Sequence, residues 1–144
     1  MTTQRTKIHE ERVVWDFPIE AVWSLVSSFG AIQAWMPSIT YCAVDGHGVG
    51  ATRTVIGLAG EVKETLEVLD DKEHFISYRI NDPVPLPAKG GFGSWKLESK
   101  GENKTSIAWT ADAEEVAVEA IPELQKVYEP FMKDCLAGLK KALS

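Results

Sequence analysis

The sequence has few of the residues that build covalent or metal-bound frameworks. Its 144 residues include two cysteines, Cys42 and Cys135, and three histidines, His9, His47 and His74. The cysteines lie far apart, neither belongs to a C-x-x-C pair or a Cys/His cluster, and the histidines are scattered. A disulfide scaffold and a zinc site therefore lack support. We expect both cysteines to be reduced core residues, and we expect no bound metal.

A surplus of positive charge is also missing, because 15 Lys and Arg face 21 Asp and Glu and the formal net charge is −6. Phosphate backbones are bound mainly by clustered cations, so nucleic acid is a poor candidate partner. No segment approaches the roughly 20 apolar residues that cross a bilayer, and the N-terminal MTTQRTKIHEER is too polar for a signal peptide. We expect no membrane partner and a cytoplasmic location.

What is present favours one ordinary globular domain. A chain of 144 residues has the usual size of one domain and is long enough to bury a core. Its 44% hydrophobic and 25% charged residues are typical globular values and argue against disorder. We expect a single domain over residues 1–144, as a monomer or a homodimer.

The first forty residues predict one strand and then two short helices. IHEERVVW, residues 8–15, alternates and ends in β-branched residues, as strands do. In residues 16–30, Pro18 suits a first helical turn and apolar residues recur at helical spacing up to Gly30. Residues 31–39 are too short for an independent helix and contain Pro37, so they predict a second small helical turn.

From Tyr41 the hydrophobic period changes to two. The strand-like segments are TYCAV, TRTVIGL, EVKETLEVL, HFISYRI, GSWKLES and TSIAWTADA, separated by turn residues such as DGHGVG, AG, DDKE and KGEN. Six consecutive strands on short turns indicate an antiparallel meander, which together with the first strand makes seven.

The C-terminal segment predicts the longest helix. Its apolar face recurs at i, i+3, i+4 and i+7 and consists of Leu124, Val127, Tyr128, Phe131, Met132, Cys135, Leu136 and Leu139. Pro130 lies inside this pattern, where we expect it to kink the helix without ending it. Only this helix is large enough to cover the sheet. The expected fold is therefore α+β, a strongly curved seven-stranded antiparallel sheet around a long kinked C-terminal helix, with a cavity between them.

Strand alternation predicts which side chains face that cavity. If Ala59-Gly60 forms the turn between the third and fourth strands, Val55 pairs with Glu64 and Arg53 pairs with Leu66. All four then share one face, which Val62 and Val68 join.

Continuing the alternation across the DDKE turn pairs Val68 with Ile76 and Leu66 with Tyr78, and it leaves Arg79 outside. A slip of one residue would reverse every side chain.

Three polar side chains, Arg53, Glu64 and Tyr78, thus fall on a mainly apolar inner face, and two interpretations stay open. Arg53 and Glu64, diagonal neighbours on adjacent strands, can form a structural buried ion pair. Alternatively, Glu64 is a general acid or base, and Arg53 or Tyr78 stabilises an oxyanion on a bound ketone or enol. These are the candidate catalytic residues.

The candidate ligand-binding residues are the inward aromatic groups and their apolar neighbours. They are Trp35, Val55, Leu66, Phe92, Trp95, Trp109, Tyr128, Phe131 and Met132. Phe92 lies between glycines in residues 89–93, a composition that fits either a movable lid or a bulged strand start. The proline-rich residues 82–87 should form a stiff rim.

Several of these segments together resemble the START-like (SRPBCC, helix-grip) superfamily, and most of all its polyketide cyclase/dehydrase-like members. They are VVWDFPIEAVWSLVSSFGAIQAWMP, GHGVGATRTV, EVKETLEVLDDKEHFISYRI and the ending GLKKAL. The loose motifs that carry the resemblance include the Pro-x-x-x-Val-Trp helix start, Trp35-Met36-Pro37, Gly50-x-x-Arg53, Glu64 and Tyr78.

The resemblance implies a helix-grip fold with a hydrophobic cavity. It also implies several functions, because the superfamily mixes cyclases, dehydratases, lipid carriers, receptors and chaperone activators. We therefore predict a ligand-binding domain for a small, mainly hydrophobic, aromatic or polyketide-like molecule, with cofactor-independent cyclase or dehydratase (lyase-type) chemistry. The alternatives are a non-catalytic carrier or sensor and, ranked last, a chaperone-activator-like protein.

Overall fold

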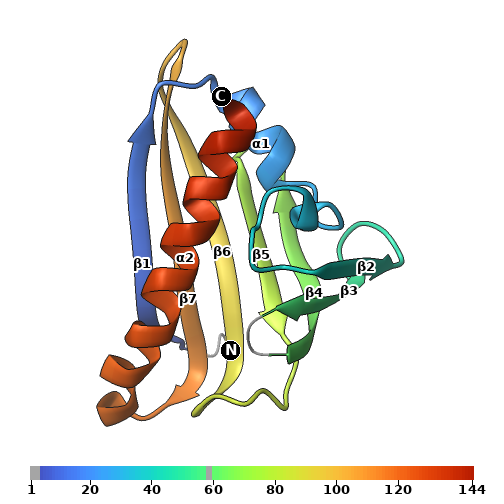
Figure 1. Ribbon diagram of the computed structural model, residues 1–144, viewed down its shortest axis with the longest axis vertical. Helices are drawn as coiled ribbons and strands as arrows, with labels where there is room; N and C mark the ends of the chain where they lie inside the picture. The colour runs from blue at the N-terminus through green and yellow to red at the C-terminus, as the bar shows by residue number, and fades with distance from the viewer. Residues whose placement is uncertain (1–3, 58–59) are drawn as a thin grey trace.

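The computed structural model describes residues 4–57 and 60–144 and shows a curved sheet with one long helix lying across its face (Figure 1). Within these residues the sheet has seven strands in the order β1-β7-β6-β5-β4-β3-β2, and each neighbouring pair is antiparallel. The strands are β1 (Thr6–Trp15), β2 (Tyr41–Asp45), β3 (Thr52–Gly57), β4 (Gly60–Asp70), β5 (Phe75–Ile80), β6 (Ala88–Gly101) and β7 (Lys104–Val116). This confirms the predicted α+β helix-grip architecture.

The helices follow the predicted order. Helix α1 (Ile19–Val26) and the 3₁₀ turn η1 (Ile32–Ala34) lie between β1 and β2. A second 3₁₀ turn, η2 (Val118–Ala120), which the sequence did not predict, leads into α2 (Ile121–Leu143). In the described part of the chain, no helix combines the length and the apolar character needed to span a membrane.

Helix α2 buries most of the apolar face that the sequence predicted, but Val127 of that face is 52% exposed. The buried residues of this face are Leu124, Met132, Cys135, Leu136 and Leu139. The helix continues through Pro130 instead of ending there. Lys140 and Lys141 lie in its last turn, where the negative end of the helix dipole stabilises positive charges. Figure 1 shows α2 crossing in front of β7 and β6, with its C-terminal end beside α1.

The register between β3 and β4 differs from the prediction by two residues. Arg53 lies directly opposite Glu64 and Val55 directly opposite Val62, rather than Arg53 opposite Leu66. A shift of two leaves every side chain on its predicted face, because the side-chain period of a strand is also two. The turn predicted at Ala59-Gly60 includes Ala59, which lies outside the described residues.

A register shift in β4, between Leu66 and Val68, changes the face of one predicted inward residue. Leu66 lies opposite Tyr78 as predicted, but Val68 lies opposite Ser77 and Leu69 lies opposite Ile76. Val68 is therefore 40% exposed and is not an inner residue. The extra residue of a β-bulge inverts the alternation beyond it, and the apolar pattern of EVKETLEVL did not reveal it.

Helix α2 approaches the segment after η1 most closely at Gly138. A Cβ atom at this position would overlap the backbone oxygen of Trp35 and the ring of Pro37. The missing side chain thus lets the helix pack against residues 35–37, and Met36 of this segment lines the inner chamber described below.

We predict that Gly138→Ala lowers the free energy of unfolding, by about 1–3 kcal/mol for the overpacked contact. An alanine in an uncrowded helix would instead raise it by about 1 kcal/mol. Guanidinium unfolding monitored by circular dichroism measures the difference. The matched control is Ala137→Gly at the exposed neighbouring position, which measures the free-energy difference between alanine and glycine in this helix without a close contact. A Gly138→Ala protein that is more stable than the wild type would contradict the close contact.

Candidate functional site

An inner chamber of about 80 Å³ lies between the sheet, the η1 region and α2. It is lined by Ile32, Met36, Ile39, Arg53, Val55, Glu64, Tyr78, Ile80, Phe92, Gly93, Trp109, Ala111, Tyr128, Phe131 and Met132. A water molecule takes about 30 Å³ in the liquid, so the chamber has room for only a few non-hydrogen atoms. It has the size of a site for a small head group.

An outer chamber of about 280 Å³ adjoins the inner one. The two share Ile39, Val55, Glu64, Ile80, Tyr128 and Phe131 as walls. The outer walls are otherwise apolar and consist of Ile8, Gly57, Gly60, Val62, Val84, Pro85, Leu86, Ala88, Gly91, Ala113 and Val127. The larger outer chamber is thus the wide apolar part of this region, and the smaller inner chamber is its narrow polar end.

Arg53 is the buried cation of the inner chamber, and its guanidinium contacts a carboxylate, a backbone carbonyl and two aromatic rings. Its side chain is 4% exposed. Its Nε and Nη2 atoms each lie 2.7 Å from Oε1 of Glu64, and Nη1 donates to the carbonyl oxygen of Phe29 at 2.7 Å. Its Cζ atom lies 4.1 Å from the Phe29 ring centroid and 4.7 Å from that of Tyr78. The predicted ion-pair contact is thus present, although the partners are directly opposite and not diagonal.

Glu64 reaches both chambers with a side chain that is 13% exposed. Both of its bonds to Arg53 end on the same carboxylate oxygen, Oε1. Among residues 4–57 and 60–144, no group donates a hydrogen bond to the other oxygen, Oε2. This oxygen is the free acceptor of the site.

Tyr78 is fully enclosed and accepts a hydrogen bond at its hydroxyl oxygen from Nε1 of Trp109, at 3.3 Å. Within the described residues the hydroxyl donates to no acceptor, so its own proton is available. The ring crosses β6 at Gly93, where a Cβ atom would overlap the phenol. Glycine at this position is what gives the Tyr78 hydroxyl its place in the inner chamber.

The low-dielectric surroundings keep both tyrosines of the site protonated at neutral pH. Burial, with a further contribution from the charge of Glu64, raises the pKa of Tyr78 to about 12. Burial and then Glu64 also raise the pKa of Tyr128, which lies where the two chambers meet. Tyr78 is thus a hydrogen-bond donor and not a base.

Of the predicted ligand-binding residues, Val55, Trp109, Tyr128, Phe131 and Met132 line the chambers. Together with the predicted catalytic residues, the structure thus gathers most of the expected site around one cavity. Their roles in binding or catalysis stay predictions.

Three other predicted binding residues, Trp35, Leu66 and Trp95, are buried but are not among the walls within the described residues. Trp95 stacks on Trp109 with centroids 4.2 Å apart, and Trp35 meets Trp95 edge-on at 5.8 Å. The rings cover one another, so the expected flat aromatic pocket is instead an aromatic stack behind the Trp109 wall.

Phe92 is a sixth predicted binding residue at a chamber wall. It borders the inner chamber, but its ring lies 4.0 Å from the guanidinium carbon of Arg5 and 4.5 Å from that of Arg79, the residue predicted to face outward. Residues 88–101 are strand β6, so the segment is a strand start and not a movable lid. The bulge expected there is absent from this described strand start, because the register shift of β6 lies between Ser99 and Gly101.

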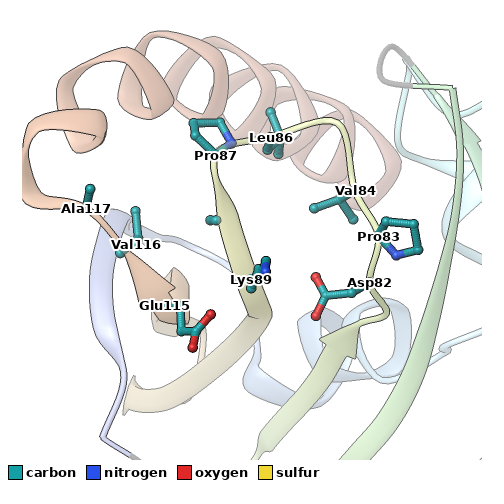
Figure 2. Close-up of a pocket in the computed structure, with 10 residues that line it drawn as sticks. Asp82, Pro83, Val84, Leu86, Pro87, Lys89, Glu115, Val116 and Ala117 are labelled. Atoms are coloured by element: carbon teal, nitrogen blue, oxygen red, sulfur yellow. The ribbon is translucent and has the colours of Figure 1, made fainter.

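The proline-rich residues 82–87 form the predicted rim. Val84 and Leu86 line the outer chamber on one side and a surface cavity of about 380 Å³ on the other. Figure 2 shows this surface cavity between the loop and the end of β7, with Glu115, Val116 and Ala117 across from it. The loop is therefore a thin wall between the apolar chamber and the outside.

Local sequence patterns did not identify the residues of the α1–η1 segment and its continuation that close one side of the inner chamber. The Phe29 carbonyl bonds Arg53, and Ile32, Met36 and Ile39 line the walls. In the sequence these positions read only as apolar helix faces, and no local signal indicates where the α1–η1 segment lies over the sheet.

We predict that stability falls between pH 10 and 12 because of Tyr78. A tyrosine in the unfolded chain has a pKa of about 10, so in this range the unfolded state loses the proton that the folded state keeps at a pKa of about 12. The wild type should lose about 1.4 kcal/mol per pH unit more than Tyr78→Phe. Urea unfolding of both proteins at several pH values measures this difference. Tyr128 contributes equally to the pH dependence of both proteins, so the difference reports on Tyr78 alone. Parallel pH profiles of the free energy of unfolding would contradict the assignment.

Comparison with known proteins supports the same fold. The chain is 42% identical over 69 residues to the abscisic acid receptor PYL10 of Arabidopsis thaliana, a match that spans 44% of this chain and only 38% of the receptor. A solution structure from Thermobifida fusca has a TM-score of 0.82 at 24% identity, covering 93% of this chain and 91% of that one.

The Zhui aromatase/cyclase from a Streptomyces species has a TM-score of 0.80 at 16% identity, covering 97% of this chain and 94% of that one. Likeness at such identities shows the fold alone. The family model described as "Polyketide cyclase / dehydrase and lipid transport" matches residues 5–144. The chain therefore belongs to the polyketide cyclase/dehydrase and lipid transport family.

Proposed function

We propose that the protein binds a small, mainly apolar molecule with its body in the outer chamber and one polar end in the inner chamber. The observation that carries this proposal is the gradient along the cavity: the wide part is almost wholly apolar, and Arg53, Glu64 and Tyr78 gather at the narrow end. Small-molecule sites commonly combine apolar walls with a few oriented polar groups.

We further propose that the site catalyses a cofactor-independent cyclisation or dehydration. Glu64 Oε2 has no other partner among the described residues and faces the same chamber as the Tyr78 hydroxyl. In the proposed step, Oε2 takes a proton from the carbon beside a ketone, and the electron pair moves onto the ketone oxygen. Tyr78 then donates a hydrogen bond to this enolate oxygen, so the negative charge is stabilised where it develops.

Ring closure follows when the enolate carbon attacks a second carbonyl group of the same molecule. Glu64 returns the proton to the new alkoxide, which becomes a hydroxyl group. In a dehydration, Glu64 then takes a second proton from the carbon next to this alcohol and passes it to the departing hydroxyl, so that the C–O bond breaks, water leaves and a C=C bond forms. No oxidant or reductant is required. Arg53 acts here as a positioning residue, because its bonds to Glu64 and Phe29 fix the orientation of the carboxylate.

A carrier or sensor is the second candidate, and the closed Arg53–Glu64 pair favours it. A carboxylate already paired with a guanidinium at 2.7 Å is a firm polar anchor for a ligand. The partial match to a protein named as a receptor points in the same direction. In this case the polar groups orient the ligand without changing it.

Native mass spectrometry of the purified protein distinguishes these functions. We predict a co-purifying apolar ligand, with a mass additional to that of the chain. The released compound is then incubated with fresh protein and analysed by liquid chromatography. Conversion supports the enzyme and unchanged recovery supports the carrier, whereas failure to bind any apolar compound would overturn both.

For the enzyme, we predict that Glu64→Gln lowers kcat by about 100-fold or more, the usual contribution of a general base. The control is Glu61→Gln, which removes an exposed carboxylate from the same strand and should leave kcat unchanged. Circular dichroism of both variants verifies folding, because the change leaves Arg53 without its anion. Full turnover by folded Glu64→Gln would exclude Glu64 as the base.

A further inference from the structure

The hydrogen-bonding capacity of the inner chamber indicates the chemistry of the ligand's polar end, given the proposed function that a ligand binds there at all. Besides the Arg53 guanidinium, two polar groups of this chamber, the largely buried Glu64 and the buried Tyr78, have unused capacity among the described residues. Glu64 Oε2 can accept a hydrogen bond, and the Tyr78 hydroxyl can donate one. Buried polar groups are nearly always satisfied, so a bound head group is expected to supply both a donor and an acceptor.

The charge of the cavity is already balanced before a ligand enters. Among its described wall residues, Arg53 is the single cation and Glu64 the single anion, and they are paired with each other. Tyr78 and Tyr128 are uncharged at neutral pH. A charged head group would therefore bring an unpaired charge into a chamber with apolar walls, which is costly.

Arg53 cannot readily serve as the counter-ion of an acidic ligand. Its Nε donates to Glu64 and its Nη1 donates to the Phe29 carbonyl, while Nη2 lies 2.7 Å from the same Glu64 oxygen and the Phe29 and Tyr78 rings lie against the guanidinium. A carboxylate could accept from the hydroxyls of Tyr78 and Tyr128, but it would lie beside the Glu64 carboxylate. This like-charge contact would outweigh neutral hydrogen bonds.

An ammonium group fails for the complementary reason. It could donate to Glu64, but it cannot accept the hydrogen bond from Tyr78 and would lie beside Arg53. A hydroxyl group meets both requirements with one oxygen atom, and it fits a chamber of about 80 Å³.

We infer that the inner chamber selects an uncharged hydroxyl-type head group, as in an apolar alcohol, phenol or enol, and rejects a carboxylate. The hydroxyl donates to Glu64 Oε2 and accepts from the Tyr78 hydroxyl. It takes the place of the few water molecules that the chamber can hold. The apolar body of the ligand fills the outer chamber.

The test uses probes that share a two-ring body and differ in one substituent: 2-naphthylmethanol, 2-naphthoate and 2-methylnaphthalene. Isothermal titration calorimetry at pH 8, where the acid is ionised, gives each Kd for the full chain. The alcohol should bind about tenfold more tightly than the methyl compound, as expected for two added hydrogen bonds. It should also bind at least about tenfold more tightly than the carboxylate.

The outcomes separate this inference from the function on which it rests. If the carboxylate binds as tightly as the alcohol, or more tightly, the head-group inference is overturned while the cavity-binding proposal stands. If none of the three probes binds, the cavity-binding proposal fails and the inference fails with it.

A matched pair of variants then tests the contact itself. Tyr78→Phe keeps the ring but removes the donor, so the advantage of 2-naphthylmethanol over 2-methylnaphthalene should shrink about threefold or more. Tyr41→Phe, at a position 47% exposed on β2, should leave the ratio unchanged. An unaltered ratio in Tyr78→Phe would overturn the assignment of Tyr78 as the donor.

Discussion

The site depends on the burial of one guanidinium group. Arg53 is almost completely removed from water, which would be strongly unfavourable for an unpaired cation. It is compensated from two elements: the Glu64 carboxylate opposite it on β4, and the Phe29 carbonyl that follows α1. The Phe29 and Tyr78 rings add favourable contacts with the cation. The group therefore holds the α1–η1 segment over the sheet as well as fixing the carboxylate.

The size of the polar end follows from packing around this group. The segment after α1 supplies Ile32, Met36 and Ile39 as walls. From the other side, the long β6–β7 hairpin brings in Trp109, backed by Trp95. Because the rings fill most of the space beneath α2, only a small chamber is left beside Tyr78. The larger outer chamber lies beside the proline-rich rim, where the side chains are aliphatic.

Both proposed activities use the same polar arrangement, and they differ in the role of one carboxylate oxygen. Arg53 engages Oε1 of Glu64, and in the proposed functions Oε2 would act on the ligand either as a base or as an acceptor. The Tyr78 hydroxyl, protonated because of its burial, serves equally to hold a ligand oxygen or to stabilise an enolate. The fold is shared by cyclases and receptors, so the chemistry depends on these few groups and not on the architecture.

Local sequence patterns were sufficient to predict the architecture and the face of the sheet on which the main polar residues lie. Periods of two and of 3.6 residues, with glycine and proline turns, indicated the seven strands and the long helix. They also placed Arg53, Glu64 and Tyr78 inward, a result that survived a two-residue error in register because two is the period of the strand.

Only the tertiary structure decided the bulge that turned Val68 outward, the outward ring of Phe92, and the tryptophan rings that cover one another. It also decided that the Phe29 carbonyl completes the Arg53 site. Alternation in one strand carries no information about where a bulge interrupts it or which distant segment covers it. Those features arise from contacts between elements far apart in the chain, which local patterns do not encode.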